Sequence, residues 1–456
     1  MNRNAAAESY VWHDGRAVPV ADEFDVVVVG GGPSGVCAAI AAARSGSRTA
    51  LVERSAFLGG TATGAMVASF MGFFWREHRV VGGIPLEVTE RLLERGASPG
   101  FGPYVLAEAS DEPIDVITFP FDPEVLKIVL DELLLGAGVQ PYLHAQAVAP
   151  IMRDYACAGI VYQGVVEQKA LRAKMVIDAS ANGTIAVLAG ATRESERRDP
   201  RERQPMTQIA RVVGVDIARF RAIPQDEKRR IAEEGLRRGA LAQKLLSVVS
   251  SPHGDDAIVL MTRVSGYDGT DEAQLARAEI DGRRMVDRLV PFLRAEVPGF
   301  EEARLGTLAS WIGVRETWRV IGRYVVDGDD VRTGTPFDDA IALGAGPIDI
   351  HESGGSGLSL VVPDRPFQVP YRALLPLGPR NLLVAGRCVS ATKEGMAGIR
   401  HMGTVMTLGQ ASGTAAAMSA ALGIDPGDLD VELLRDRLAL DGAILDTAAA
   451  APFAPS

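Results

Sequence analysis

The stretch that most constrains this chain is DVVVVGGGPSGVCAAIAAARSGSRTALVE, residues 25–53. Its four consecutive valines have the β-branched character of a strand that is covered on both faces. Gly30, Gly32 and Gly35 follow at the spacing G-x-G-x-x-G. The first glycine permits a tight turn, the second lets a pyrophosphate approach the backbone, and the third lets a helix over residues 33–45 pack closely on the strand. This order predicts a strand-turn-helix unit that binds a dinucleotide.

An acidic residue completes this prediction. The phosphates would lie at the helix N-terminus, beside Pro33 and Ser34, where unpaired N–H groups and the positive end of the helix dipole favour an anion. Glu53 ends the next predicted strand, residues 49–52, and lies 23 residues after Gly30. Its carboxylate can accept hydrogen bonds from both hydroxyls of an adenosine ribose and would repel a 2′-phosphate. A lone glycine triplet would be a weak signal, but strand, helix and acid together favour a dinucleotide site.

A second region indicates which dinucleotide is bound. Residues 381–423 are predicted to form a buried strand, a glycine-rich loop and a long helix of small residues, which would allow close packing against a large flat ligand. Together with a helix over 121–139, a strand over 171–178 and the DASANG turn, the chain resembles the FAD-dependent oxidoreductase family of the glutathione-reductase fold. The resemblance covers most of the chain, and its matching segments are FLGGTATGAMV (57–67), FDPEVLKIVLDELLLGAGV (121–139), AEIDGRRMVDRLVPFLRAEVPGFEEARL (278–305), GVRETWRVIGRYVV (313–326), IDIH (348–351), VPYRALLP (369–376), VAGRCVSAT and GIRHMGTVMTLGQASGTAAA.

The resemblance implies an α/β fold, with a Rossmann-like FAD-binding domain of glutathione-reductase type and an inserted α+β substrate or cap domain. The expected FAD-binding domain is discontinuous and comprises residues 24–56, 120–195 and 370–425. The expected substrate domain comprises 57–119 and 196–369, with amphipathic helices within 223–247 and 271–296. Outside these domains lie an N-terminal extension, 1–23, with a hairpin at Asp14-Gly15, and a C-terminal helix and flexible tail, 426–456.

The resemblance also implies FAD as the cofactor and a set of residues that hold it. The helix that begins near Gly403 would direct its positive end toward the flavin. One loop departs from the family pattern: Asn182-Gly183 stands where the family commonly has Asp-Gly, and Ala181 where it has Gly, so weaker contacts are expected there. Cofactor contacts are expected from Gly30, Gly32, Pro33, Ser34, Gly35, Glu53, Arg54, Gly60, Thr61, Ala62, Ala179, Ser180, Gly386, Arg387, Gly403 and Thr404.

The charge balance narrows the partners. The chain has 47 basic and 58 acidic residues, a formal net charge of -11, which disfavours nucleic acid and anionic membrane surfaces as partners. No apolar stretch has the length of a membrane span or the pattern of a signal peptide, so we expect a cytoplasmic protein. Cys37, Cys157 and Cys388 are scattered, which favours buried thiols over a disulfide framework, and the sequence predicts no metal site.

Several absent motifs restrict the reaction. There is no C-x-x-C or C-x-x-x-x-C pair, which excludes the dithiol relay of a disulfide reductase. No second G-x-G-x-x-G follows a strand and opens a helix, so no dedicated nicotinamide domain is expected. The last predicted strand leads into Gly386-Arg387, where flavin hydroxylases of this fold usually have Gly-Asp. These absences favour direct hydride exchange between flavin N5 and a small-molecule substrate, with oxygen, a quinone or another molecule as electron acceptor.

Four residues are candidates for the chemistry. A proton must accompany the hydride, and histidine is the side chain whose pKa best suits neutral pH. His351 ends the apolar run IDIH and matches a family position that faces the flavin pocket, although a structural role is equally well supported. Arg400 and His401 stand at the helix entrance, and His401, where the family usually has an aliphatic residue, marks either particular chemistry or a packing variant. Arg315 either clamps substrate or forms an internal ion pair with Glu316.

Three hypotheses about function remain. The leading one is an FAD-dependent dehydrogenase or oxidase that acts on a small polar metabolite, either neutral or anionic. The second is a flavin-dependent isomerase or lyase without net redox change, in which the flavin transfers a hydride to the substrate and later takes a hydride back. The third is a non-catalytic flavin-binding protein, whose flavin no metabolite would bleach.

Overall fold

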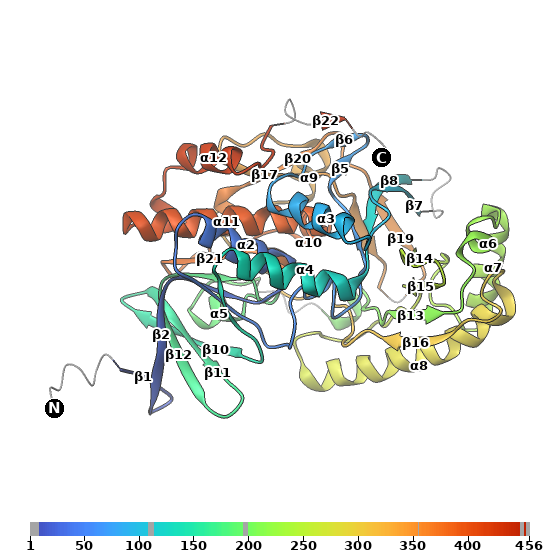
Figure 1. The fold of residues 1–456 in the computed structure, drawn as a ribbon, viewed down its shortest axis with the longest axis horizontal. Coiled ribbons are helices and arrows are strands. Elements are labelled where there is room, and N and C mark those ends of the chain that lie inside the picture. The colour runs from blue at the N-terminus through green and yellow to red at the C-terminus, as the bar shows by residue number, and fades with distance from the viewer. Residues whose placement is uncertain (1–8, 108–113, 195–198, 354, 447–450, 453–456) are drawn as a thin grey trace.

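The computed structural model describes residues 9–107, 114–194, 199–353, 355–446 and 451–452. Its main sheet has eight strands, and helices lie against it (Figure 1). A second, four-stranded sheet with its own helices lies at the right of the view. Each of these two parts contains its own cluster of buried apolar side chains.

The dinucleotide-binding unit forms as the sequence predicts. β2 (Arg16–Val29) leads through the glycine turn into α2 (Pro33–Arg44), and β3 (Thr49–Val52) returns parallel to β2. The four valines of β2 are at most 4% exposed, as expected for a strand covered on both faces. The neighbouring parallel strands are β9 (Gln140–Tyr142), beside β3, β12 (Gln168–Asp178), beside β2, and β21 (Leu382–Val384), beside β12.

The same sheet continues into an antiparallel part, because β2 and β12 are long enough to take part in both. β1 (Tyr10–His13) pairs with the start of β2 through the predicted hairpin, and both turn residues, Asp14 (φ +47°) and Gly15 (φ +73°), are left-handed as a type I′ turn requires. On the other side, β12 pairs with the hairpin formed by β10 (Gln146–Arg153) and β11 (Ala156–Gln163).

The long helix of small residues packs on another helix. α11 (Met402–Leu422) begins one residue before the predicted start and is buried along almost all of its length. A Cβ atom added to Gly409 or Gly413 would lie 2.1 Å from a backbone oxygen of α2, at Ser34 and Ala38. The prediction that these small residues make room for a flat ligand is therefore wrong at these two glycines, where they permit close contact between α11 and α2.

The second sheet has the antiparallel order β14-β15-β13-β16, formed by Val248–Ser250, Asp256–Val259, Ala210–Val213 and Arg304–Leu308. α8 (Glu272–Glu296) matches the predicted helix over 271–296, and its apolar face contributes to the separate core of this part. α7 (Gln225–Arg237) follows α6 (Ile217–Arg221) and is shorter than the predicted 223–247. The helix ends there because Gly239 takes a left-handed conformation (φ +67°).

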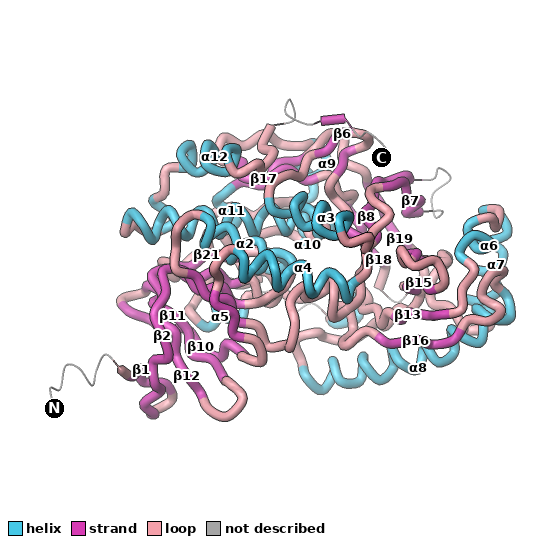
Figure 2. Tube along the Cα trace, in the orientation of Figure 1, coloured by secondary structure: helices cyan, strands magenta, loops and turns pink. Residues whose placement is uncertain are grey.

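The remaining helices and strands lie outside the four-stranded sheet and its helices (Figure 2). The helices are α3 (Ile84–Glu94), α4 (Pro123–Gly136), α5 (Thr184–Leu188), α9 (Gly328–Thr333), α10 (Lys393–Ile399) and α12 (Val431–Leu440). The strands are β4 (Ser69–Phe70), β5 (Phe74–Trp75), β6 (His78–Arg79), β7 (Gly102–Ala107), β8 (Ile114–Pro120), β17 (Ala340–Gly344), β18 (Ile348–His351), β19 (Leu358–Val361), β20 (Phe367–Pro370) and β22 (Ala451–Pro452). Short 3-10 helices occur at Pro200–Glu202, Tyr371–Leu374, Gly386–Cys388 and Pro426–Asp428.

The predicted domain boundaries stay predictions. Buried side chains within 57–119, among them Leu58 and Phe119, belong to the same core as the dinucleotide-binding strands. α12 lies in the predicted C-terminal helix region, and β22 pairs with β6. The flexible tail was expected within 426–456, of which 447–450 and 453–456 lie outside the described residues.

Candidate functional site

The glycine turn between β2 and α2 has the tight geometry that phosphate binding requires. Gly30 is left-handed (φ +101°), and a Cβ atom there would lie 2.5 Å from the Ala179 carbonyl oxygen. At Gly35 a Cβ atom would lie only 1.8 Å from the Gly30 carbonyl oxygen, so only glycine permits α2 to begin this close to β2. Gly32 differs, because no atom lies within 4 Å of its Cβ position. The backbone is therefore compact behind the turn and open beside Gly32, as a ligand approaching the backbone requires.

Glu53 lies directly against this turn. Its Oε2 accepts a hydrogen bond from the Gly31 backbone N–H at 2.6 Å, and its Oε1 accepts from the backbone N–H and the hydroxyl of Ser55 at 2.8 and 2.7 Å. The next loop folds over the same place, because Gly59 N–H donates to the Gly31 carbonyl oxygen and Gly60 contacts Gly32. Within that loop Ala62 is buried, whereas Thr61 is exposed, and Arg54 is also exposed.

Unpartnered polar atoms occur at the start of α2, in the segment after β21 and at the start of α11. Among the described residues, no hydrogen-bond partner is found for Ser34 Oγ, Thr404 Oγ1 or Arg387 Nη1, although each atom is buried. The N-terminus of α2, which begins at Pro33, also has no side-chain cap from any residue that the structure describes. Burial lowers the pKa of Arg387 to about 10. The preceding residue, Gly386, lies close to Ser34, because a Cβ atom on Gly386 would be 3.3 Å from Ser34 Cβ. Buried polar atoms ordinarily have partners, so these groups fit a polar, anionic ligand such as a dinucleotide.

Two of the residues predicted to contact the cofactor make hydrogen bonds within the protein. The Gly403 N–H, in the first turn of α11, donates to the Met71 carbonyl oxygen. The Ser180 N–H donates to Asp178 Oδ1, and the Ser180 hydroxyl accepts from the Thr184 N–H. Ala179 supports the turn through its carbonyl oxygen, as described above for Gly30. These positions shape the walls of the site, and their contacts with the cofactor stay predictions.

The loop that departs from the family pattern is held by side chains. Asn182 Oδ1 accepts hydrogen bonds from Arg387 Nη2 at 3.0 Å and Thr317 Oγ1 at 3.1 Å, and the Asn182 carbonyl oxygen accepts from Trp318 Nε1 at 2.5 Å. Ala181 has a left-handed backbone (φ +68°) at the position where glycine is usual. That conformation is unfavourable for a residue with a Cβ atom.

Replacing Ala181 with glycine should therefore stabilise the protein. Relief of the left-handed strain is expected to raise the free energy of unfolding by about 1 kcal/mol. Urea denaturation of the holoprotein measures this change. The matched control is Ala276→Gly, an exposed site inside α8, which should lose about 1 kcal/mol. Equal losses at both sites would show that Ala181 carries no strain.

Basic side chains and one carboxylate form a second cluster around the end of β18. Arg400 Nη2 lies 3.0 Å from Asp349 Oδ2 and also donates to the Asp349 backbone oxygen at 2.9 Å. His351 Nε2 lies 3.3 Å from Asp349 Oδ1. The Gln204 side-chain oxygen accepts from the His351 backbone N–H at 3.3 Å and from Arg400 at 3.5 Å. Asp349 therefore holds both the predicted base and the predicted arginine.

Arg315 joins this cluster and does not pair with Glu316. Arg315 Nη1 donates to the Pro205 carbonyl oxygen at 2.6 Å and to Thr207 Oγ1 at 2.7 Å. Within the described ranges, Glu316 has its ion pair with Arg319 at 3.5 Å. The internal ion pair between Arg315 and Glu316, one of the two predicted alternatives, is thus wrong.

The protonation states follow from burial and neighbouring charges. Burial and the Arg315 charge lower the pKa of His351 to about 4, although Asp349 opposes the shift. His351 is therefore neutral at pH 7 and can accept a proton. Burial alone would raise the pKa of Asp349, but His351 and Arg400 outweigh it and keep the pKa well below its usual range. Burial, together with the Arg400 charge, lowers the pKa of Arg315 to about 9.

His401 has a structural contact. Its Nε2 lies 2.9 Å from the Pro347 carbonyl oxygen, the ring is buried, and its Cδ2 lies against Gly346. Burial and the adjacent Arg400 lower its pKa, so this ring is also neutral. A neutral ring bonded to a carbonyl oxygen donates through Nε2, which ties the start of α11 to the loop before β18. This contact supports the alternative that His401 is a packing variant. A catalytic role for His401 stays a prediction.

Asp349, Gln204 and Arg263 belong to the cluster but were not among the predicted site residues. Arg263 is buried, and its Nη2 donates to the Gly357 carbonyl oxygen at 2.6 Å. Asp349 could have been identified from the sequence, because a carboxylate inside the apolar run IDIH needs a partner. No sequence pattern identifies Arg263 or Gln204, because only the tertiary fold brings them to β18.

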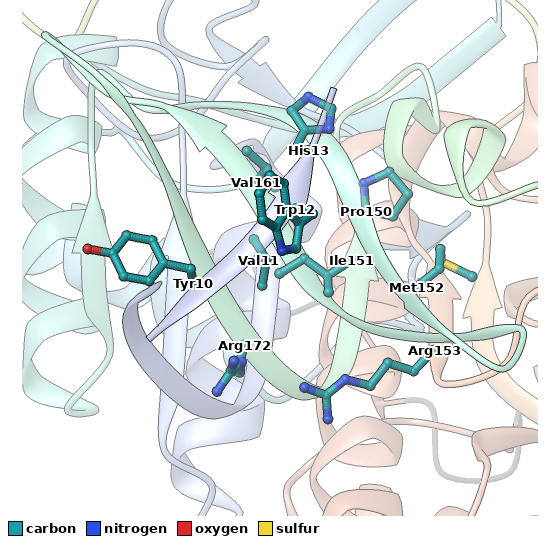
Figure 3. Close-up of a pocket in the computed structure, with 10 residues that line it drawn as sticks. All are labelled: Tyr10, Val11, Trp12, His13, Pro150, Ile151, Met152, Arg153, Val161 and Arg172. Carbon is teal, nitrogen blue, oxygen red and sulfur yellow. The ribbon is translucent and has the colours of Figure 1, made fainter. Parts of the chain in front are cut away.

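A cavity of about 260 Å³ lies elsewhere, between β1 and the hairpin of β10 and β11 (Figure 3). Trp12 and Ile151 contribute to its wall, and none of the predicted site residues does. β1, which lines the cavity, pairs with the beginning of β2. The glycine turn follows the other end of β2, roughly 35 Å away along the strand. It is therefore separate from the dinucleotide site.

The three thiols are buried and free, as the sequence predicts. Burial raises the pKa values of Cys37, Cys157 and Cys388, so these thiols stay protonated at neutral pH. Among the described residues, no helix combines the length and apolar composition that a bilayer span requires.

The chain is similar to known flavin-dependent proteins in sequence and in fold. A family model described as FAD dependent oxidoreductase matches residues 25–438. A solved geranylgeranyl bacteriochlorophyll reductase-like protein from Thermoplasma acidophilum is similar at TM-score 0.50 and 16% identity, over 92% of this chain and 83% of that chain. The flavin-dependent brominase Bmp2 gives a TM-score of 0.49 at 14% identity, over 91% and 84% of the two chains. A dihydrolipoyl dehydrogenase of Trypanosoma brucei brucei is 56% identical over 46 residues, only 10% of either chain.

Proposed function

This chain belongs to the FAD-dependent oxidoreductase family, and we propose that it is a dehydrogenase or oxidase that exchanges a hydride between its flavin and a small, anionic metabolite. The observation that carries the proposal is the cluster at β18, in which a neutral histidine and two arginines surround one largely buried carboxylate. The electron acceptor, whether oxygen, a quinone or another molecule, belongs to the second half of the reaction. We also propose a cytoplasmic location.

FAD is the cofactor, and the residues at the glycine turn fit it. The N–H groups at the start of α2 and the open side of Gly32 would receive the pyrophosphate, and Glu53 would receive the adenosine ribose. Arg387, Ser34 and Thr404 would each supply a buried polar atom for which the described part of the chain offers no hydrogen-bond partner. When bound, FAD supplies a ring system that accepts or returns a hydride.

His351 would move the proton that accompanies the hydride. Its imidazole is neutral at pH 7, and so it can take a proton from a hydroxyl or amino group of the substrate. Asp349 would orient the ring, because its carboxylate lies 3.3 Å from Nε2. The carboxylate would also stabilise the imidazolium after proton transfer.

Arg400 and Arg315 would bind the negative charge of the substrate. A guanidinium presents a planar set of donors that matches a carboxylate. Arg400 is held by Asp349 and Gln204, and Arg315 by Pro205 and Thr207, so both side chains are positioned before substrate arrives. Such preorganisation reduces the entropy lost on binding.

We further propose the glutathione-reductase type of architecture. The FAD-binding domain would comprise 24–56, 120–195 and 370–425, and the second sheet with α8 would form the core of a cap over the substrate. The separate apolar core of that sheet supports its independence. The convergence of Arg263, from the segment after β15, with Arg400, after α10, supports a substrate site between the two parts.

Anaerobic screening of metabolites tests the proposed function. Purified protein should be yellow, with flavin absorbance near ~450 nm, and an anionic substrate should abolish this absorbance when oxygen is absent. A flavin that no metabolite bleaches would support the non-catalytic alternative. Turnover of a metabolite under strict anaerobiosis, with no acceptor and no net oxidation, would support the isomerase or lyase alternative.

A further inference from the structure

The β18 cluster contains more positive than negative charge. Three guanidinium groups, those of Arg263, Arg315 and Arg400, interact electrostatically with one carboxylate, that of Asp349. Asp349 makes its ion pair with Arg400, 3.0 Å away. Because His351 and His401 are neutral, the three arginines and Asp349 together have an excess of two positive charges.

The excess lies on Arg263 and Arg315. Their hydrogen-bond acceptors are neutral: the Gly357 carbonyl oxygen for Arg263, and the Pro205 carbonyl oxygen and Thr207 hydroxyl for Arg315. Within the described parts of the chain, neither arginine has an ion pair with a carboxylate. Glu352 attracts Arg263 more strongly than Asp349 does, but Glu352 is exposed, so solvent screens much of its charge.

This arrangement is costly in the free protein. Burying a cation without a counter-charge is unfavourable, and here the cations also repel one another. The pKa values reflect this, since burial lowers those of Arg263 and Arg315, and the Arg263 and Arg400 charges lower that of Arg315 further. The chain as a whole has a net charge of -11, so the local excess runs against its overall composition. A ligand that neutralises both cations would remove the cost.

We propose that the substrate of this site is a dianion with two carboxylates, one neutralising Arg315 beside Arg400 and the other neutralising Arg263. A single carboxylate would leave one guanidinium without a counter-charge. This inference deepens the proposed function and rests on it for the assignment of the cluster to substrate.

Binding of probe anions to oxidised holoprotein tests this inference without turnover. Isothermal titration calorimetry at low ionic strength should give dissociation constants for malonate and succinate about 10- to 100-fold below that for propionate, as expected for one additional charge-assisted interaction. Inorganic phosphate, measured in the same way, shows whether the site prefers a phosphate group to two carboxylates. Tighter binding of phosphate than of either dicarboxylate, or equal binding of succinate and propionate, would overturn the proposal.

Variants locate the two charges. Arg263→Gln and Arg315→Gln should each remove the preference for succinate over propionate, whereas Arg230→Gln, an exposed ion-pair residue on α7, should preserve it. The ligand-free variants should unfold at the same or a higher temperature than wild type, because a repulsive buried charge is removed. A preference retained in both cluster variants would refute the site.

The proposed function and this inference can fail separately. If dicarboxylates bind with the expected preference but no metabolite bleaches the flavin, the dianion site stands and the redox assignment fails. If an uncharged or monoanionic metabolite reduces the flavin while dicarboxylates bind no better than propionate, the redox assignment stands and the dianion inference fails.

Discussion

Protein with Gly35 replaced by alanine should purify without FAD. The added methyl group would lie 1.8 Å from the Gly30 carbonyl oxygen and 3.2 Å from Ala179 Cβ. The first contact is with backbone, so no side-chain rotation can relieve it, and α2 must move away from β2. Such overpacking typically costs about 1–3 kcal/mol, and it displaces the N–H groups that would bind the pyrophosphate. We expect at least about a 100-fold loss of FAD affinity, since two lost hydrogen bonds to a charged group cost about 3 kcal/mol or more.

The ratio of absorbance near ~450 nm to protein absorbance, followed by titration with added FAD, measures this loss. Gly136→Ala is the matched control, because this exposed glycine at the end of α4 has no atom within 4 Å of its Cβ position. The control should keep its FAD and gain up to about 1 kcal/mol in stability. Normal FAD affinity in the Gly35→Ala protein would place the cofactor somewhere other than the turn after β2.

The dinucleotide-binding unit was predictable because its constraints are local. Four buried valines require a covered strand, and the glycine spacing requires a turn into a helix, whatever the rest of the chain does. α2 ends one residue before the predicted end and β3 spans the predicted residues 49–52, whereas β2 begins at Arg16, ten residues before the predicted strand of valines. The Asp14-Gly15 hairpin was predictable for the same reason, because a two-residue turn depends on two left-handed residues.

Long-range packing was harder to predict. The small residues of α11 indicate that something approaches closely, but they do not say what, and at Gly409 and Gly413 the neighbour is α2. The predicted helix over 223–247 failed in its second half because helical spacing continues past Gly239, where the backbone turns. Periodicity describes one face of an element, whereas its end depends on a single residue.

The charged cluster shows the same limit at the candidate site. His351, Arg400 and Arg315 could be selected from sequence as residues of suitable chemistry, but their shared neighbour Asp349 could be assigned to them only from the fold. Arg263 lies almost 140 residues before Arg400 in sequence, and no local pattern connects the two. The balance of charge, from which the dianion inference follows, exists only once these segments meet.

Replacing His351 with alanine should slow flavin reduction by about 10²- to 10⁴-fold, the usual contribution of a positioned acid or base. FAD content should not change, because His351 contacts Asp349 and Gln204 and none of the groups at the glycine turn. Anaerobic stopped-flow measurement of flavin absorbance, using a substrate found by screening, gives the rate constant. His13→Ala, a change at the distant hairpin, is the matched control and should reduce at the wild-type rate.

The pH dependence separates a base from a merely structural histidine. Asp349, Arg315 and Arg400 are the charged groups that face the ring, and with burial they place the pKa of His351 near 4. The base is active when neutral, so the wild-type rate constant should be constant at neutral pH and fall as the pH drops through about 4. The alanine variant should lack this step, because no imidazole remains to be protonated. If the wild-type rate instead fell near pH 6.5, the value for an unperturbed histidine, the cluster would not control this residue. If the step persisted in the variant, another group would be the base.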